Sequence, residues 1–94
     1  MANVTKLPPQ NIEAEQSLLG ALLIDKEAIV RAVEALRAND FYRTDTHGQI
    51  YGAMMELFEK REPIDLITLS EELRRKGLFD KIGGAAYLTT LVNV

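Results

Sequence analysis

The apolar residues of this chain recur at helical spacing in each segment, and no segment alternates apolar and polar residues as a half-buried strand does. The clearest helix follows Pro8-Pro9, which stop any earlier helix and favour an extended lead-in. Asn11 is a good N-cap, and Glu13 and Glu15 place negative charge in the first turn, where the helix dipole favours it. The apolar stripe of this helix comprises Ile12, Leu18, Leu19, Leu22 and Leu23.

Further helices are expected at four places along the chain. The second helix is expected to follow Asp25 as N-cap, and the third to run from Thr44 or Asp45 to about Lys60. The fourth is expected to cover 66–76, with Asp65 as N-cap and Gly77 as stop, and the last helix to follow Gly83-Gly84. Phe41 and Tyr42 are expected to be apolar anchors on a connecting turn. The pattern predicts an all-α fold, a compact orthogonal bundle of about five to six helices.

A second line of residues on the first helix allows two interpretations. Ala14, Ser17 and Ala21 follow one another at i, i+3 and i+7, and their small side chains would let another helix approach closely. They are equally consistent with ordinary helix fillers on a half-exposed face.

The bulk properties restrict the class of protein. The 94 residues suit one small domain, and an apolar content of 47% is ordinary for a globular chain. No cysteine is present, so the sequence has no disulfide framework and no thiolate metal site. The longest apolar run, Leu18–Ile24, is much too short to span a membrane, which predicts a cytoplasmic protein.

The sequence lacks the motifs that catalysis would need. No glycine precedes a Lys-Ser or Lys-Thr pair, so a phosphate-cradling loop is absent. His47 is the single histidine, and we expect it to be a polar residue in the first turn of its helix. Asp40, Asp45 and Asp65 could form an acidic cluster, but two of them are explained as helix starters. We therefore predict no catalytic, cofactor or metal site; an enzyme using His47 or Asp65 is the least favoured class.

One basic run, Arg74-Arg75-Lys76, suggests an alternative function. A small helical DNA-binding domain could use helix 66–76 in a groove of the duplex. The competing interpretation is a solvated last turn whose cations suit the helix dipole, and Glu71 and Glu72 on the same helix would repel phosphate. With 11 basic and 14 acidic side chains the net charge is −3, which also argues against direct DNA binding.

Four residues are candidates for contacts with a partner protein. Glu13 lies away from the leucine stripe and should face solvent, although helix-dipole complementarity alone would explain it. Tyr87 is of the type enriched at interfaces, and core packing with the hydroxyl at the edge is its alternative role. Leu88 and Leu91 on the last helix, together with the adjacent Val92, are expected to be left partly bare and able to pair with a second copy.

Five separated blocks of residues resemble one family. They are Pro8-Pro9 with Glu13-Ala14-Glu15 and Ser17-Leu18-Leu19-Gly20, Asp40-Phe41-Tyr42, His47-Gly48-Gln49-Ile50-Tyr51, Pro63-Ile64-Asp65-Leu66-Ile67-Thr68-Leu69, and Ile82-Gly83-Gly84-Ala85-Ala86-Tyr87-Leu88. The chain is similar from about Leu7 to its last residue to the N-terminal domain of the bacterial replicative DNA helicase of the DnaB type.

The resemblance implies an assembly role rather than a catalytic one. Residues 10–94 would be the globular head of the helicase N-terminal domain and residues 1–9 a flexible arm. The helical hairpin and the C-terminal ATPase motor of the family would be absent, and ATP and magnesium belong only to that motor. The helical pattern stops abruptly at Val94, so we expect a piece of a longer chain. In this family the N-terminal domains form dimers and a collar on a hexameric ring, and they receive the C-terminal domain of primase; a helicase loader is a further candidate partner.

Overall fold

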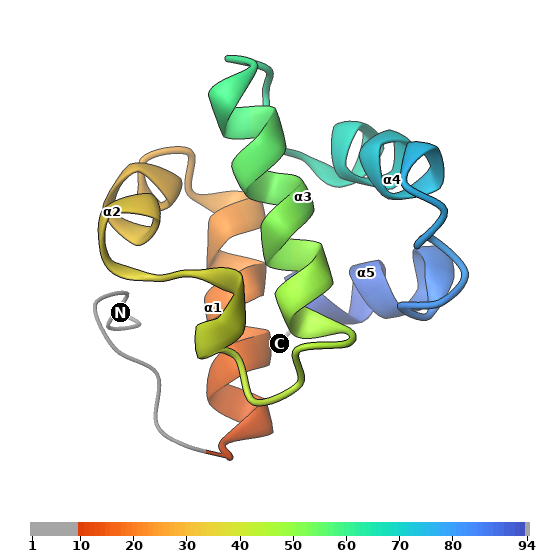
Figure 1. Ribbon diagram of the computed structural model, residues 1–94, viewed down its shortest axis with the longest axis horizontal. Coiled ribbons are helices and arrows are strands. Elements are labelled where there is room, and N and C mark those ends of the chain that lie inside the picture. Colours follow the sequence, from red (N-terminus) through yellow and green to blue (C-terminus); the bar gives the residue numbers. More distant parts are fainter. Residues whose placement is uncertain (1–9, 94) are drawn as a thin grey trace.

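The computed structural model describes residues 10–93, and within that range it contains five α-helices, one short 3-10 helix and no strand (Figure 1). The elements are α1 (Ile12–Ile24), α2 (Ala28–Ala35), η1 (Ala38–Asp40), α3 (His47–Glu59), α4 (Leu66–Arg75) and α5 (Gly84–Val92). The predicted all-α bundle of about five to six helices is confirmed. The arm expected at residues 1–9 lies outside the described residues.

Helix α3 runs through the middle of the molecule, with α2 on one side and α4 and α5 on the other (Figure 1). It contacts α1, α4 and η1, while α5 packs on α1 and α4. The one tyrosine that is completely buried, Tyr51 of α3, donates a hydrogen bond from its hydroxyl to the carbonyl oxygen of Leu36 (3.0 Å). Burial raises the pKa of this hydroxyl to about 12. The core therefore surrounds α3, and the buried Tyr51 hydroxyl has a partner in it.

Helices α1 and α4 begin after the N-cap residues predicted for them, and α4 stops at the predicted glycine. The Asn11 side chain accepts from the backbone N–H of Ala14 (2.9 Å), and Asp65 accepts from the N–H of Thr68 (2.9 Å). Thr68 returns the bond through its hydroxyl to the N–H of Asp65, which completes a capping box. Gly77 ends α4 with a φ of +73°, a left-handed conformation that glycine adopts without steric cost.

Two helix starts were predicted too early. The Asp25 side chain accepts from the N–H of Glu27 (3.0 Å) in a turn, and α2 begins only at Ala28. The carbonyl oxygen of Arg43 accepts from the N–H groups of Thr46 and Gly48 (3.2 and 3.0 Å), so the chain turns there before α3 begins at His47. In both places local turn bonds delay the helix.

The prediction that Leu88 and Leu91 are partly bare is wrong: each is only 1% exposed. The reason is a close backbone approach between α5 and α1. A Cβ atom added to Gly20 would lie 2.1 Å from the carbonyl oxygen of Leu91, so only glycine at position 20 allows this packing. The close contact is made at Gly20, and Ser17 and Ala21 line a shallow hollow beside Leu91.

Of the two aromatic residues expected to anchor the 41–42 turn, only one is buried. Phe41 is buried (1% exposed) and packs its ring against Tyr51 at a centroid distance of 5.2 Å. Tyr42 instead points its side chain to solvent and is 59% exposed. The turn therefore presents an aromatic side chain at the surface beside a buried one.

Candidate partner-binding site

The structure places Glu13 and Tyr87 on neighbouring parts of the surface. Glu13 is exposed on the first turn of α1. Gln16, one turn further along the same side of the helix, donates from Nε2 to the hydroxyl oxygen of Tyr87 on α5 (3.2 Å). The side of α1 that carries Glu13 therefore adjoins the half-buried ring of Tyr87.

The Tyr87 hydroxyl points inward, toward the first turn of α3. It lies 2.5 Å from Nε2 of His47, and the two rings stack with an interplanar angle of 13°. Gly83 allows this position, because a Cβ atom there would lie 2.7 Å from Cβ of Tyr87. Only part of the Tyr87 side chain faces solvent, and its polar end is held inside.

Glu15 completes a buried hydrogen-bonded chain, which we call the Glu15–His47–Tyr87 relay. One carboxylate oxygen of Glu15 accepts from Nδ1 of His47 (2.7 Å), and the other accepts from the backbone N–H of Tyr42 (2.5 Å). The N–H of Arg43 adds a longer contact (3.5 Å). A carboxylate at Nδ1 assigns an imidazole hydrogen to that atom, and in the neutral ring Nε2 then accepts from the Tyr87 hydroxyl.

The relay has the order carboxylate, imidazole, hydroxyl that a general base would need, but it has no access for a substrate. Glu15 is 1% exposed and His47 is 0% exposed, and both imidazole nitrogens already have partners. His47 does lie in the first turn of its helix as predicted, but it is a core residue. The arrangement fixes geometry rather than supplying a reacting atom.

Sequence reasoning missed Glu15 and His47 as members of one site, although a signal was present. Glu15 lies three residues after Ile12 and four before Leu19, on the apolar stripe of α1. His47 lies three residues before Ile50 in the same way. A charged or polar residue on an apolar stripe is expected to be buried, and a buried polar group needs a hydrogen-bond partner. Two such residues on different helices therefore indicate that they bond to each other.

The basic run of α4 is engaged within the domain. Arg75 and Lys60 both pair with Glu72, Lys60 Nζ lying 3.2 Å from Glu72 Oε1, and Lys76 Nζ lies 2.6 Å from Glu56 Oε1. We call these five residues the Glu72 ion-pair cluster. The hydrogen bond from Lys76 is the main reason that the pKa of Glu56 is lowered.

The third cation of the run also has an internal contact. The guanidinium carbon of Arg74 lies 4.1 Å from the centroid of the Phe79 ring. All three cations that a recognition helix would use are therefore occupied by neighbours.

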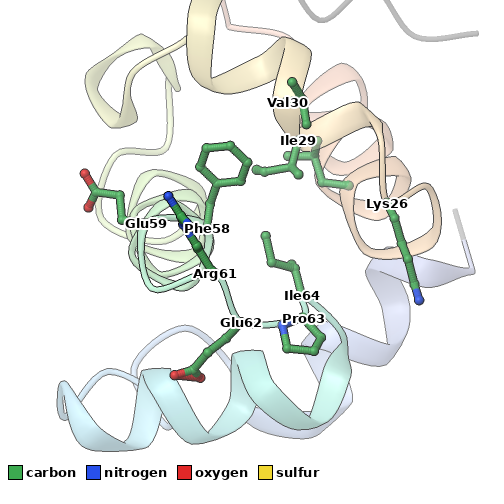
Figure 2. Close-up of a pocket in the computed structure, with 10 residues that line it drawn as sticks. Lys26, Ile29, Val30, Phe58, Glu59, Arg61, Glu62, Pro63 and Ile64 are labelled. Atoms are coloured by element: carbon green, nitrogen blue, oxygen red, sulfur yellow. The ribbon is translucent and has the colours of Figure 1, made fainter.

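An open groove of about 680 Å³ lies between the α1–α2 turn and the segment that joins α3 to α4. Figure 2 shows Ile29, Phe58 and Ile64 meeting across it, with Lys26 at one edge and Glu62 at another. Its lining is mainly apolar and includes no member of the relay. The groove is a surface hollow whose lining contains no serine, threonine or histidine side chain.

Among residues 10–93, the histidine, aspartate and glutamate side chains form no group of three that could hold a metal ion. Within the same range, none of the helices combines the length and the apolar character that a membrane crossing requires.

Residues 7–94 match the sequence profile described as the DnaB-like helicase N terminal domain. The chain belongs to this family. It is 48% identical over 86 residues to the replicative DNA helicase DnaB of Mycobacterium leprae (strain TN), and 47% identical over 88 residues to the replicative DNA helicase DnaC of Bacillus subtilis (strain 168). These alignments cover 92% and 94% of this chain. The resemblance inferred from the five sequence blocks is confirmed.

The likeness extends to a solved structure of the same domain. The crystal structure of the N-terminal domain of DnaB helicase from Mycobacterium tuberculosis is similar with a TM-score of 0.86 and 47% identity, over 93% of this chain and 61% of that one. The chain spans 14% and 19% of the length of the two replicative helicases. The match is thus to the N-terminal, non-catalytic domain of the DnaB-like family.

Proposed function

We propose that this domain is the globular head of a replicative helicase and serves assembly and protein interaction in DNA replication. It contributes to the N-terminal collar of a hexameric ring, in which heads associate as dimers, and it receives the C-terminal domain of primase. A helicase loader is a further candidate partner. The head comprises residues 10–94, acts in the cytoplasm, and leaves ATP and magnesium to a separate motor domain.

One observation carries this proposal: residues 7–94 match the N-terminal domain of replicative helicases at 43–48% identity to three family members. At that identity the surface as well as the core is expected to be related. A protein-binding role also agrees with the chemistry of the site, because the buried imidazole has no access to a substrate.

Glu13 and Tyr87 are the proposed contact residues. Glu13 is exposed, and the Tyr87 ring is half-buried beside the same side of α1. A partly buried tyrosine supplies a large contact area at a low cost in side-chain entropy, which is why tyrosine is frequent among residues that dominate interfaces. A single contact of this size is weak, so repetition around a ring would supply much of the avidity.

DNA binding by helix α4 is the less favoured function. Arg75 and Lys76 pair with Glu72 and Glu56, so binding phosphate would require these ion pairs to break. A mobility-shift titration on fork DNA at two salt concentrations tests this rival. We expect weak binding with little dependence on salt.

Sedimentation velocity of the chain over a concentration series, alone and with the C-terminal domain of primase, tests the proposal. We expect a complex with primase that Glu13→Ala and Tyr87→Ala weaken. Glu34→Ala, which removes an exposed glutamate of α2, is the matched control and should bind as the wild type does. A chain that stays monomeric throughout and forms no complex would contradict the assembly role.

A further inference from the structure

The Glu15–His47–Tyr87 relay connects two separate parts of the surface. At one end the Tyr87 ring emerges from α5, and at the other the Glu15 carboxylate holds the backbone of Tyr42 and Arg43. The Tyr42 side chain is 59% exposed and Arg43 is exposed as well. The half-buried Tyr87 and the exposed Tyr42 thus sit at opposite ends of one hydrogen-bonded chain.

The inner part of the relay has no contact with solvent that could replace a broken bond. Glu15 and His47 are 1% and 0% exposed, and they come from different helices, α1 and α3. In a low-dielectric interior, hydrogen bonds in series polarise one another, and a broken one leaves a group unpaired. A change at the Tyr87 hydroxyl is therefore expected to alter the hydrogen bonding of His47 and of the Glu15 carboxylate.

We propose that Glu15 and His47 are positioning residues for the partner-binding surface. They fix the Tyr87 ring at one end of the relay and the 42–43 backbone at the other, so that Tyr87 and the exposed Tyr42 and Arg43 are presented to a partner in a fixed relative arrangement. The proposal rests on the proposed function for the identity of the partner, but the coupling between the two ends exists without a partner. Pre-organisation of this kind raises affinity because less freedom is lost on binding.

The first experiment reads the coupling in the free protein. His47 is the only histidine of the chain, so a long-range proton–nitrogen NMR spectrum of the imidazole contains one ring. We expect a single tautomer with the hydrogen on Nδ1. Tyr87→Phe keeps the ring and removes the hydroxyl, and it should shift the Nε2 resonance and also the backbone amide resonances of Tyr42 and Arg43.

Tyr42→Phe is the matched control, because it removes the hydroxyl of an exposed tyrosine whose side chain is outside the relay. It should leave both imidazole nitrogens unchanged. If Tyr87→Phe leaves Nε2 and the two amides where they are in the wild type, the coupling does not exist and the proposal is wrong.

The second experiment measures whether the relay acts on binding through Tyr87. The dissociation constant for the C-terminal domain of primase is determined for Tyr87→Phe, His47→Gln and the double variant. Loss of one hydrogen bond should weaken binding about fivefold in Tyr87→Phe. His47→Gln should weaken binding by a smaller factor in the Tyr87→Phe background than in the wild type, because the bond between His47 and Tyr87 is already absent there. Losses that multiply fully would show that His47 acts independently of Tyr87, and would overturn the positioning role.

The two proposals fail in different ways. A wild-type chain that binds no primase domain would remove the proposed partner, while the imidazole and amide spectra would still decide the coupling. If His47→Gln does not fold, Tyr87→Phe and Tyr87→Ala still separate hydroxyl from ring: equal affinity of wild type and Tyr87→Phe, with loss only in Tyr87→Ala, would contradict a role for the relay in binding.

Discussion

A buried carboxylate lies near each end of α3, Glu15 of α1 at one end and Glu72 of α4 at the other, and the two charges are compensated in different ways. At the N-terminal end Glu15 is held by an imidazole and by backbone N–H groups, all of them fixed by the fold. At the C-terminal end Glu72 is only 2% exposed, yet its partners Lys60 and Arg75 have side chains that are 39% and 60% exposed. The first carboxylate is compensated from within the core and the second from the solvent edge.

This difference decides what each carboxylate can do. The partners of Glu72 are long, solvent-exposed side chains that can turn into water if the pair breaks, so the Glu72 ion-pair cluster mainly ties α3 to α4. The partners of Glu15 cannot leave, and they come from α3 and from the 42–43 segment, with α5 attached through Tyr87. Fixed partners give a definite geometry, and this is the property that a binding surface needs.

Removal of the Glu15 side chain should have the largest effect. Glu15→Ala leaves the Nδ1 of His47 and the N–H of Tyr42 without their acceptor in a buried environment, and should lower the free energy of unfolding by about 3 kcal/mol. Urea unfolding followed by helicity measures it. Glu13→Ala, an exposed glutamate on the same helix, is the control and should change stability by less than about 0.5 kcal/mol. Equal losses in the two variants would show that the relay is not fixed in the core.

A substitution at Gly20 tests the helix contact that supports the relay. Gly20→Ala places a methyl group 2.1 Å from the carbonyl oxygen of Leu91, so α1 and α5 must separate. We expect a loss of about 2 kcal/mol. Gly52→Ala on α3 is the matched control: no atom lies within 4 Å of the added Cβ, and the higher helix propensity of alanine should stabilise the protein by about 0.5–1 kcal/mol. Effects of the same sign would mean that α5 does not pack closely on α1.

The corresponding change in the Glu72 ion-pair cluster should cost less than Glu15→Ala. Glu72→Ala leaves Lys60 and Arg75 free to turn into solvent, and should lower the free energy of unfolding by about 1–1.5 kcal/mol. Glu71→Ala, its exposed neighbour on α4, should be close to neutral. A loss in Glu72→Ala as large as in Glu15→Ala would remove the distinction between the two ends of α3.

The features that the sequence predicted correctly have all their determinants within a few residues. The predicted N-cap Asp65 finds its bonding partner, Thr68, within one turn, and Gly77 ends the same helix by a purely local backbone conformation. The apolar stripes likewise predicted the all-α fold. Such features can be recognised without knowing which helices meet.

The relay could not be predicted in the same way, because its members are far apart in the chain. Glu15 meets Tyr42 and His47 across 27 and 32 residues, and His47 meets Tyr87 across 40. The burial of Leu91 was missed for a similar reason, since it depends on a glycine on another helix. The sequence identified Tyr87 as a candidate, but only the fold shows what lies beneath it.

The smallest predicted effect concerns pH at the solvent-exposed edge of the Glu72 ion-pair cluster. The pKa of Glu56 lies below its usual value of 4.5, chiefly because Lys76 donates a hydrogen bond to the carboxylate. A carboxyl group whose pKa is lower in the folded state stabilises the fold above its unfolded pKa, and this contribution disappears as the pH falls through the folded value. Glu56→Gln should therefore reduce the loss of stability that the wild type shows on acidification below about pH 4.5.

The size of this effect is limited because the Glu56 side chain is 41% exposed. At neutral pH we expect Glu56→Gln to cost no more than about 0.5 kcal/mol, and less in high salt, because solvent and ions screen the pair. Urea unfolding at a series of pH values, with Glu59→Gln as the exposed control on the same helix, separates this pair from the general acid dependence. If both variants follow the wild-type pH profile, the ion pair between Lys76 and Glu56 adds nothing to stability. The exposed ion pairs of the Glu72 ion-pair cluster would then contribute even less, relative to the buried contacts of Glu15, than we expect.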